Sequence, residues 1–193
     1  SLNSEIYIDK TELIAYTNKK LNTEQGYICV SRPRRFGKSM AANMLTAYYS
    51  RGCDSRGLFQ GLKIATHPDF EKHLNQYNVI HLNMRDYLTE SENMKQLIQF
   101  VEDDLLDELQ QEFSDLRMPR RKTLVKVLEQ AFVQYKIPFV FIIDEWDCIF
   151  RVHKSDAASQ KDYLDFLRNL LKDKSYIALA YMTGILPIKK YGE

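Results

Sequence analysis

Three residues near the start of the chain have the types and the order needed to bind phosphate. Gly37, Lys38 and Ser39 end the segment SRPRRFGKSM (31–40) and match the end of the phosphate-loop pattern G-x-x-x-x-G-K-[ST]. In such a loop, backbone N–H groups face the polyphosphate, the lysine neutralises the outer phosphates and the hydroxyl contacts magnesium. The segment predicts a nucleotide site with Ser39 as a metal ligand, and the alternative is a basic surface turn.

The beginning of this segment departs from the pattern. Arg32 stands where the first glycine is expected, and Pro33 restricts Arg32 to extended conformations. The segment therefore indicates a stiff, arginine-rich loop. The residues that we expect to contact nucleotide are Arg32, Pro33, Arg34, Arg35, Phe36, Gly37, Lys38, Ser39 and Met40.

Two carboxylates follow an apolar segment that has the character of a buried strand. FVFII (139–143) leads directly into Asp144 and Glu145. In nucleotide hydrolases, the acid at such a strand end holds magnesium, and a second group orients or activates the attacking water. We therefore expect Asp144 on the metal and Glu145 as the catalytic base. The competing interpretation is a helix N-terminus, which favours acidic residues.

A polar residue also ends the last apolar segment, IALAYMTG (177–184). In the additional-strand class of phosphate-loop ATPases, such a residue lies beside the loop and senses the γ-phosphate. We assign this catalytic role to Thr183. The alternative is an ordinary threonine at the end of a strand.

Strands and helices alternate along the chain, and these elements must position the polar residues. Apolar runs predict strands over 26–31, 78–84, 139–143 and 176–183. Helical periodicity is found over 39–48, 94–109, 124–135 and 163–171, and the otherwise irregular stretch 51–77 is expected to hold a short helix over 68–77. The alternation predicts an α/β fold with a parallel sheet flanked by helices. Within the additional-strand class of P-loop NTPases, the 28–31 strand would be central and the 177–182 strand would separate it from 140–143.

Composition limits the classes of function. Hydrophobic residues make up 45% of the 193 residues, and the formal net charge is +1. These values are typical of a globular domain and give no global reason to expect a nucleic-acid or membrane partner. The three cysteines are far apart, which argues against a disulfide framework and predicts a reducing, cytoplasmic location.

Several other polar residues receive a structural interpretation. The four histidines have no metal-ligand spacing, and His81, inside an apolar run, is expected in the core. Trp146 is expected to pack. The basic stretch 117–122 is predicted to be a solvated turn between helices, with a partner or nucleic-acid contact as the alternative.

The chain resembles the bacterial AAA-ATPase-like family over nearly its whole length. The segments that carry this resemblance occur in the family's order: YIDKTELI (7–14), SRPRRFGKSM (31–40), LFQGLKI (58–64), FIIDEWD (141–147) and YMTGILPIKKYG (181–192). The family's loop typically reads R-P-R-R-F-G-K-[ST], so the absence of the first glycine looks like a family trait. Trp146 stands where members more often have tyrosine.

The resemblance implies ATP and Mg²⁺ as ligands of a single nucleotide-binding domain over residues 1–193, whose C-terminal part we expect to be missing. ATP is favoured over GTP because no N-K-x-D motif follows the loop. Members often continue into a nuclease-like domain, which would bring nucleic acid as a partner. A homo-oligomer or another protein partner is also open, and no membrane partner is expected.

Three functions remain open at this point. The first is an ATPase that uses Glu145, the second a nucleotide-gated binding module with little turnover, and the third a nucleic-acid-associated protein that uses the basic loop. Related ATPases complete their sites with an arginine from a neighbouring subunit. We therefore expect this chain to bind Mg-ATP and to hydrolyse it slowly on its own.

Overall fold

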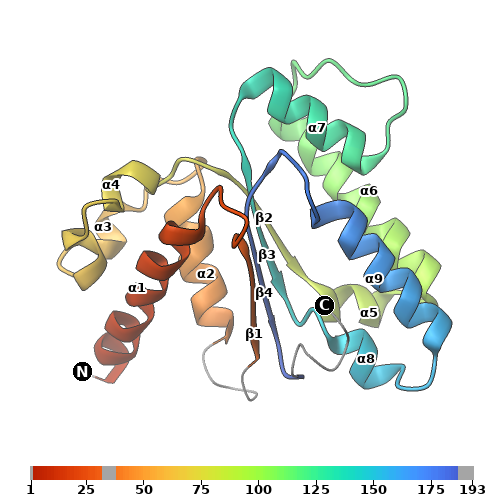
Figure 1. Ribbon diagram of the computed structural model, residues 1–193, viewed down its shortest axis with the longest axis horizontal. Coiled ribbons are helices and arrows are strands. Elements are labelled where there is room, and N and C mark those ends of the chain that lie inside the picture. Colours follow the sequence, from red (N-terminus) through yellow and green to blue (C-terminus); the bar gives the residue numbers. More distant parts are fainter. Residues whose placement is uncertain (1, 32–37, 187–193) are drawn as a thin grey trace.

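A computed structural model describes residues 2–31 and 38–186; the side chains of residues 2–10, Lys38 and Ser39 lie outside this description. The described chain forms a parallel four-stranded sheet between two helical layers (Figure 1). The strands are β1 (Tyr27–Ser31), β2 (Asn78–Asn83), β3 (Phe139–Asp144) and β4 (Ile177–Gly184). The α/β fold that the alternation predicts is confirmed.

Helices precede, connect and cover these strands. They are α1 (Leu2–Lys20), α2 (Lys38–Tyr49), α3 (Arg56–Phe59), α4 (Phe70–His73), α5 (Met84–Glu90), α6 (Met94–Glu112), α7 (Leu124–Tyr135), α8 (Cys148–Val152) and α9 (Ala157–Leu171), with a 3-10 turn, η1 (Lys63–Thr66). Sequence periodicity predicts α2, α6, α7 and α9, and the short helix expected within 68–77 corresponds to α4, whereas α1, α3, α5 and α8 were not predicted. Among the described helices, none combines the length and the apolar character needed to cross a membrane.

The strand order of the sheet is β1-β4-β3-β2. The expected placement of β4 between β1 and β3 is confirmed, and Ser31 pairs with Gly184 at the carboxyl end. The expectation that β1 would be central is wrong, because it lies at an edge of the described sheet. Its side chains are mostly half-buried or exposed, and only Ile28 is buried. An apolar run alone therefore did not distinguish an edge strand from a central one.

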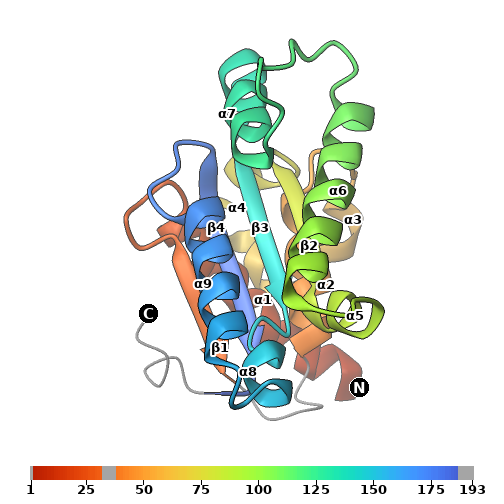
Figure 2. The same ribbon diagram turned by 90° about the vertical axis from the view of Figure 1, so that its right-hand side faces the viewer.

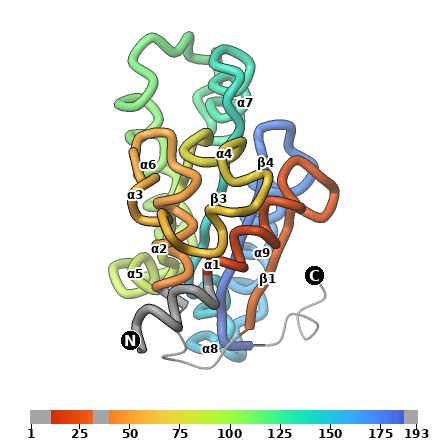
Figure 3. The backbone as a smooth tube through the Cα atoms, turned by 90° about the vertical axis from the view of Figure 1, so that its left-hand side faces the viewer, coloured from red at the N-terminus to blue at the C-terminus, as the bar shows by residue number. Residues whose placement is uncertain are grey.

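The side chains of β3 alternate between the two helical layers. All six of its residues are buried. Phe139, Phe141 and Ile143 pack into the core under α5–α9, which Figure 2 shows in front of the sheet. Val140 and Ile142 pack into the core under α1–α4, the layer that faces the viewer in Figure 3. The end of β3 is therefore fixed from both sides.

α1 is attached to α2 through buried polar side chains. Thr17 Oγ1 lies 2.6 Å from Tyr49 Oη, which donates to Asn18 Oδ1 at 2.7 Å. Asn18 Nδ2 donates to Tyr48 Oη at 3.1 Å, and that hydroxyl donates to the carbonyl oxygen of Phe70 at 2.8 Å. Burial raises the pKa of both tyrosines, so their hydroxyls remain donors. A polar face of this kind gives α1 no apolar periodicity in the sequence.

The basic stretch between α6 and α7 is exposed at Arg117, Arg120, Arg121 and Lys122. The main-chain N–H of Arg117 donates to Gln134 Oε1 at 2.9 Å, which ties the stretch to α7. The predicted exposure of this connection between two helices is confirmed, and the partner or nucleic-acid contact stays a prediction.

Lys136→Gly is expected to stabilise the protein. Lys136 ends α7 with a φ of 64°, a left-handed conformation. This conformation costs a non-glycine residue about 1–2 kcal/mol, and the extra freedom of glycine in the unfolded chain offsets about 0.5–1 kcal/mol of that. Urea unfolding should therefore show a gain of about 0.5–1 kcal/mol.

Lys172→Gly is the matched control for this substitution. Lys172 is also exposed and ends a helix, but its φ is −79° and its backbone is extended. Glycine should give no gain there, and an equal gain at both positions would contradict the explanation.

Candidate functional site

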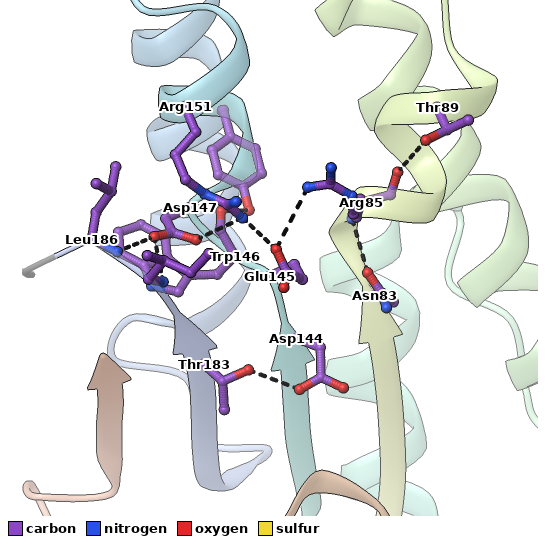
Figure 4. Close-up of polar contacts among 12 residues, drawn as sticks. Asn83, Arg85, Thr89, Asp144, Glu145, Trp146, Asp147, Arg151, Thr183 and Leu186 are labelled. Carbon is purple, nitrogen blue, oxygen red and sulfur yellow. Dashed lines mark hydrogen bonds and ion pairs between the residues drawn. The ribbon is translucent and has the colours of Figure 1, made fainter. Parts of the chain in front are cut away.

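Three polar side chains line up at the carboxyl ends of neighbouring strands. Asp144 ends β3 and is 6% exposed. Thr183 Oγ1, from β4, donates to Asp144 Oδ1 at 2.8 Å (Figure 4). His81 Nε2, from β2, lies 2.9 Å from Asp144 Oδ2 and donates to it, because a carboxylate can only accept. Two of the residues predicted to do chemistry, Asp144 and Thr183, are thus in direct contact.

The expectation that His81 is a core histidine is wrong. His81 is exposed, and its second ring nitrogen lies 3.4 Å from Thr46 Oγ1 of α2. β2 is an edge strand of the described sheet, so a side chain in the middle of its apolar run is only partly covered. The apolar neighbours of His81 in the sequence gave no sign of this contact with Asp144.

The basic loop joins two elements that meet the site at the same edge of the sheet. β1 ends at Ser31 and α2 begins at Lys38, which confirms the strand and the helix predicted on either side of the segment 32–37. The N-terminal end of α2 lies at the carboxyl edge of the strands (Figure 1). The loop residues Arg32, Pro33, Arg34, Arg35, Phe36 and Gly37 lie outside the described residues, as do the side chains of Lys38 and Ser39. Met40, in the first turn of α2, is 40% exposed.

Glu145 leaves the strand in an unusual conformation and is paired with arginine. Its φ is 54°, in the left-handed region, which costs a non-glycine residue about 1–2 kcal/mol. Its carboxylate oxygen Oε2 accepts a hydrogen bond from Nη2 of Arg151, in α8. A second guanidinium, that of Arg85 in α5, lies 3.9 Å from the same oxygen. The carboxylate of the predicted base is therefore held between two cations.

Asp147 is a polar residue of the site that sequence reasoning missed. It is completely buried, and Arg151 Nη2 lies 3.4 Å from its Oδ1. Its Oδ2 accepts hydrogen bonds from the main-chain N–H groups of Ile185, at 2.8 Å, and Leu186, at 2.5 Å. The sequence held one indication of this buried carboxylate, the third acid in DEWD (144–147). An acid so close to a buried strand needs a hydrogen-bond or charge partner.

The turn between β3 and α8 is fixed by main-chain contacts. The main-chain N–H of Trp146 donates to the carbonyl oxygen of Thr183 at 3.0 Å. The Tyr163 hydroxyl donates to the carbonyl oxygen of Trp146 at 2.6 Å. Trp146 is 2% exposed, which confirms its predicted packing role. Burial raises the pKa of the neighbouring Cys148 thiol to about 12, so this cysteine stays protonated and is no nucleophile.

The geometry around Asp144 fits a magnesium ion that is held partly by phosphate. Magnesium commonly takes only one or two protein carboxylates and keeps water and phosphate oxygens as its other ligands. Asp144 is a carboxylate oriented by Thr183 and His81, as a metal ligand in such a site would be. No group of three or more acidic, histidine or cysteine side chains able to hold a metal exists among the described residues.

A parallel sheet with polar side chains at its carboxyl edge is typical of α/β proteins that bind a ligand at that edge. Comparison with known families then gives a more specific result. The sequence model of the AAA-ATPase-like family, described as predicted AAA-ATPases, matches residues 2–192, and the chain belongs to this family. This membership supports a nucleotide-binding, ATPase-like module. No curated protein matches the chain.

Gly184→Ala is expected to destabilise this site. A Cβ atom at position 184 would lie 2.6 Å from Asp147 Cγ, and a shift of this carboxylate would disturb its hydrogen bonds with the main-chain N–H groups of Ile185 and Leu186. Overpacking of this kind typically costs about 1–3 kcal/mol, which urea unfolding would measure.

Gly57→Ala serves as the control, because no atom lies within 4 Å of a Cβ added there. This helical position should be neutral or gain up to about 1 kcal/mol. Wild-type stability of Gly184→Ala would show that Asp147 is not held as described.

Proposed function

We propose that this chain is a P-loop NTPase of the additional-strand class, and that it binds and hydrolyses Mg-ATP at the carboxyl edge of the sheet. Family membership supports ATP as the nucleotide. The fold supports the class, because β4 separates β1 from β3. The reaction is attack of a water on the γ-phosphate, with ADP as the leaving group.

The contact between Thr183 and Asp144 is the observation that carries this proposal. The two residues are 39 positions apart in the chain, yet the inserted strand brings Thr183 Oγ1 to 2.8 Å from Asp144 Oδ1. A sensor residue must lie between the phosphate loop and the metal-binding acid. β4 has this position, since it pairs with β1, which leads into the loop, and with β3, which ends in the acid.

The loop supplies the phosphate contacts in this proposal. Lys38 neutralises the outer phosphates, Ser39 and Asp144 contact magnesium, and backbone N–H groups of the loop face the phosphates. Arg32, Arg34 and Arg35 add positive charge close to the same groups. The magnesium ion, when bound, neutralises charge that develops on the phosphate oxygens.

Glu145 is the proposed base that activates the water. It directly follows Asp144 and lies at the carboxyl edge of the sheet. A second candidate function is a nucleotide-gated binding module with little turnover, which would apply if the pairing with Arg151 kept the Glu145 carboxylate from accepting a proton. The rate of hydrolysis distinguishes the two functions.

Lys38→Ala is expected to weaken ATP binding by about 10- to 100-fold. A hydrogen bond to a charged group contributes about 1.5–3 kcal/mol, which corresponds to this range. Isothermal titration calorimetry with Mg-ATP would measure the change. The control is Lys126→Ala on α7, which removes an exposed lysine that pairs only loosely with Glu129. Equal affinity of wild type and Lys38→Ala would exclude the phosphate-loop function.

Glu145→Gln is expected to leave Mg-ATP affinity unchanged and to slow hydrolysis. A general base contributes about 10²–10⁴-fold to the rate. Because turnover by the chain alone should be slow, a single-turnover assay with protein in excess over ATP is the appropriate measurement, with the exposed Glu112→Gln as the control.

Hydrolysis that survives Glu145→Gln would show that another residue is the base. Binding of Mg-ATP by the wild type with no hydrolysis would favour the nucleotide-gated binding module instead.

A further inference from the structure

Arg151 contacts both the proposed base and a buried acid to which the proposed function gives no role. We propose that Arg151 is a positioning residue, which holds the Glu145 carboxylate in place for catalysis and is itself held by Asp147. This inference rests on the proposed function, because it concerns the residue that activates the water. Figure 4 shows Arg151 between the two carboxylates.

The contacts of Arg151 are suited to holding a carboxylate. Its Nη2 atom donates to Glu145 Oε2 and lies 3.4 Å from Asp147 Oδ1. The arginine side chain is 13% exposed, Glu145 is 20% exposed and Asp147 is fully buried. Charge pairs so shielded from water are screened little by salt, so this pair fixes the position of Glu145 more firmly than a surface pair would.

Two observations argue against a purely structural role for Arg151. Its Nε is buried and has no hydrogen-bond partner among the described residues, although a structural arginine normally satisfies its buried donors. The partner residue Glu145 has a left-handed backbone, which glycine or asparagine would adopt at lower cost. Both features are unfavourable for folding alone. They are explained if the carboxylate of Glu145 is needed at this place.

Asp147 connects this support to the end of β4. Its second oxygen accepts the main-chain N–H groups of Ile185 and Leu186, directly after the strand that carries Thr183. Gly184 allows the close approach, because a side chain there would collide with the Asp147 carboxylate. The proposed base and the proposed sensor are therefore supported by the same buried carboxylate, one through Arg151 and the other through the backbone of β4.

Arg85 contributes less to the position of Glu145. Its Nη1 lies 3.9 Å from Glu145 Oε2, and its side chain is 48% exposed. A half-exposed pair at this distance is screened by water and holds a side chain weakly. We therefore assign the positioning role to Arg151 alone.

The test compares four variants of the chain with the wild type. Arg151→Met removes the charge at similar length, and Arg151→Lys keeps a cation without the planar guanidinium. Because Arg151→Met leaves Asp147 as a buried unpaired charge, Arg151→Met/Asp147→Asn removes both charges, and the introduced side-chain amide can still accept hydrogen bonds from the two main-chain N–H groups. The matched control is Arg168→Met, which replaces a half-exposed arginine on α9.

Three measurements are made on each variant. Circular dichroism verifies folding, calorimetry gives Mg-ATP affinity and a single-turnover assay gives the rate.

We expect Arg151→Met and the double variant to keep Mg-ATP affinity within about twofold and to lose at least about tenfold in rate, up to the 10²–10⁴-fold that a base contributes. Arg151→Lys should recover part of the rate, and Arg168→Met should match the wild type. A purely structural arginine would give a double variant that is stable and hydrolyses ATP at the wild-type rate.

The outcomes separate this inference from the proposed function. If the folded double variant hydrolyses ATP at the wild-type rate, the inference alone is overturned. A double variant that hydrolyses ATP faster than the wild type also overturns it, because Arg151 would then restrain the base. Failure of the wild type to bind Mg-ATP overturns the proposed function and this inference together. Binding without hydrolysis also overturns the inference, but it supports the binding module.

Discussion

The complete burial of β3 is the constraint on which the rest of the structure depends. Its side chains alternate between two cores, so neither helical layer can shift without disturbing the other. The strand must end where polar groups can again be accommodated, and at that point Asp144 meets Thr183 and His81. The rigidity of the candidate site thus comes from apolar packing, and its chemistry comes from the first residues beyond that packing.

The three acids of DEWD (144–147) differ in function because their surroundings differ. Asp144 accepts hydrogen bonds from the Thr183 hydroxyl and the His81 imidazole, which orient its carboxylate as that of a metal ligand would be. Glu145 is paired with the guanidinium groups of Arg151 and Arg85. Asp147 is fully buried and contacts the Arg151 guanidinium and two main-chain N–H groups. Identical chemistry at almost adjacent positions therefore yields a metal ligand, a base and a support in the proposed site. The partners of each carboxylate, more than its residue type, separate these roles.

Much of the fold was predictable, since long periodic segments such as α6 and α7 and the apolar run 139–143 of β3 carry strong local signals. The contact between Asp144 and Thr183 was predictable only through the strand order of a known class of fold. α1 was missed because its buried face includes Thr17 and Asn18, and α5 and α8 were missed because they are too short to show a period. The pairing of Arg151 with Glu145 depends on the left-handed turn at Glu145, for which the residue type gives no indication.

The hydroxyl network between α1 and α2 has a consequence for how the first helix is seated. An apolar interface tolerates sliding, whereas hydroxyl and amide groups are satisfied only at one alignment of the two helices. Displacing α1 by one turn would leave several buried groups unpaired, at about 1–3 kcal/mol each. The network therefore fixes the alignment of α1 on α2. A partner that binds α1 would therefore also act on the position of α2, the helix that begins at Lys38.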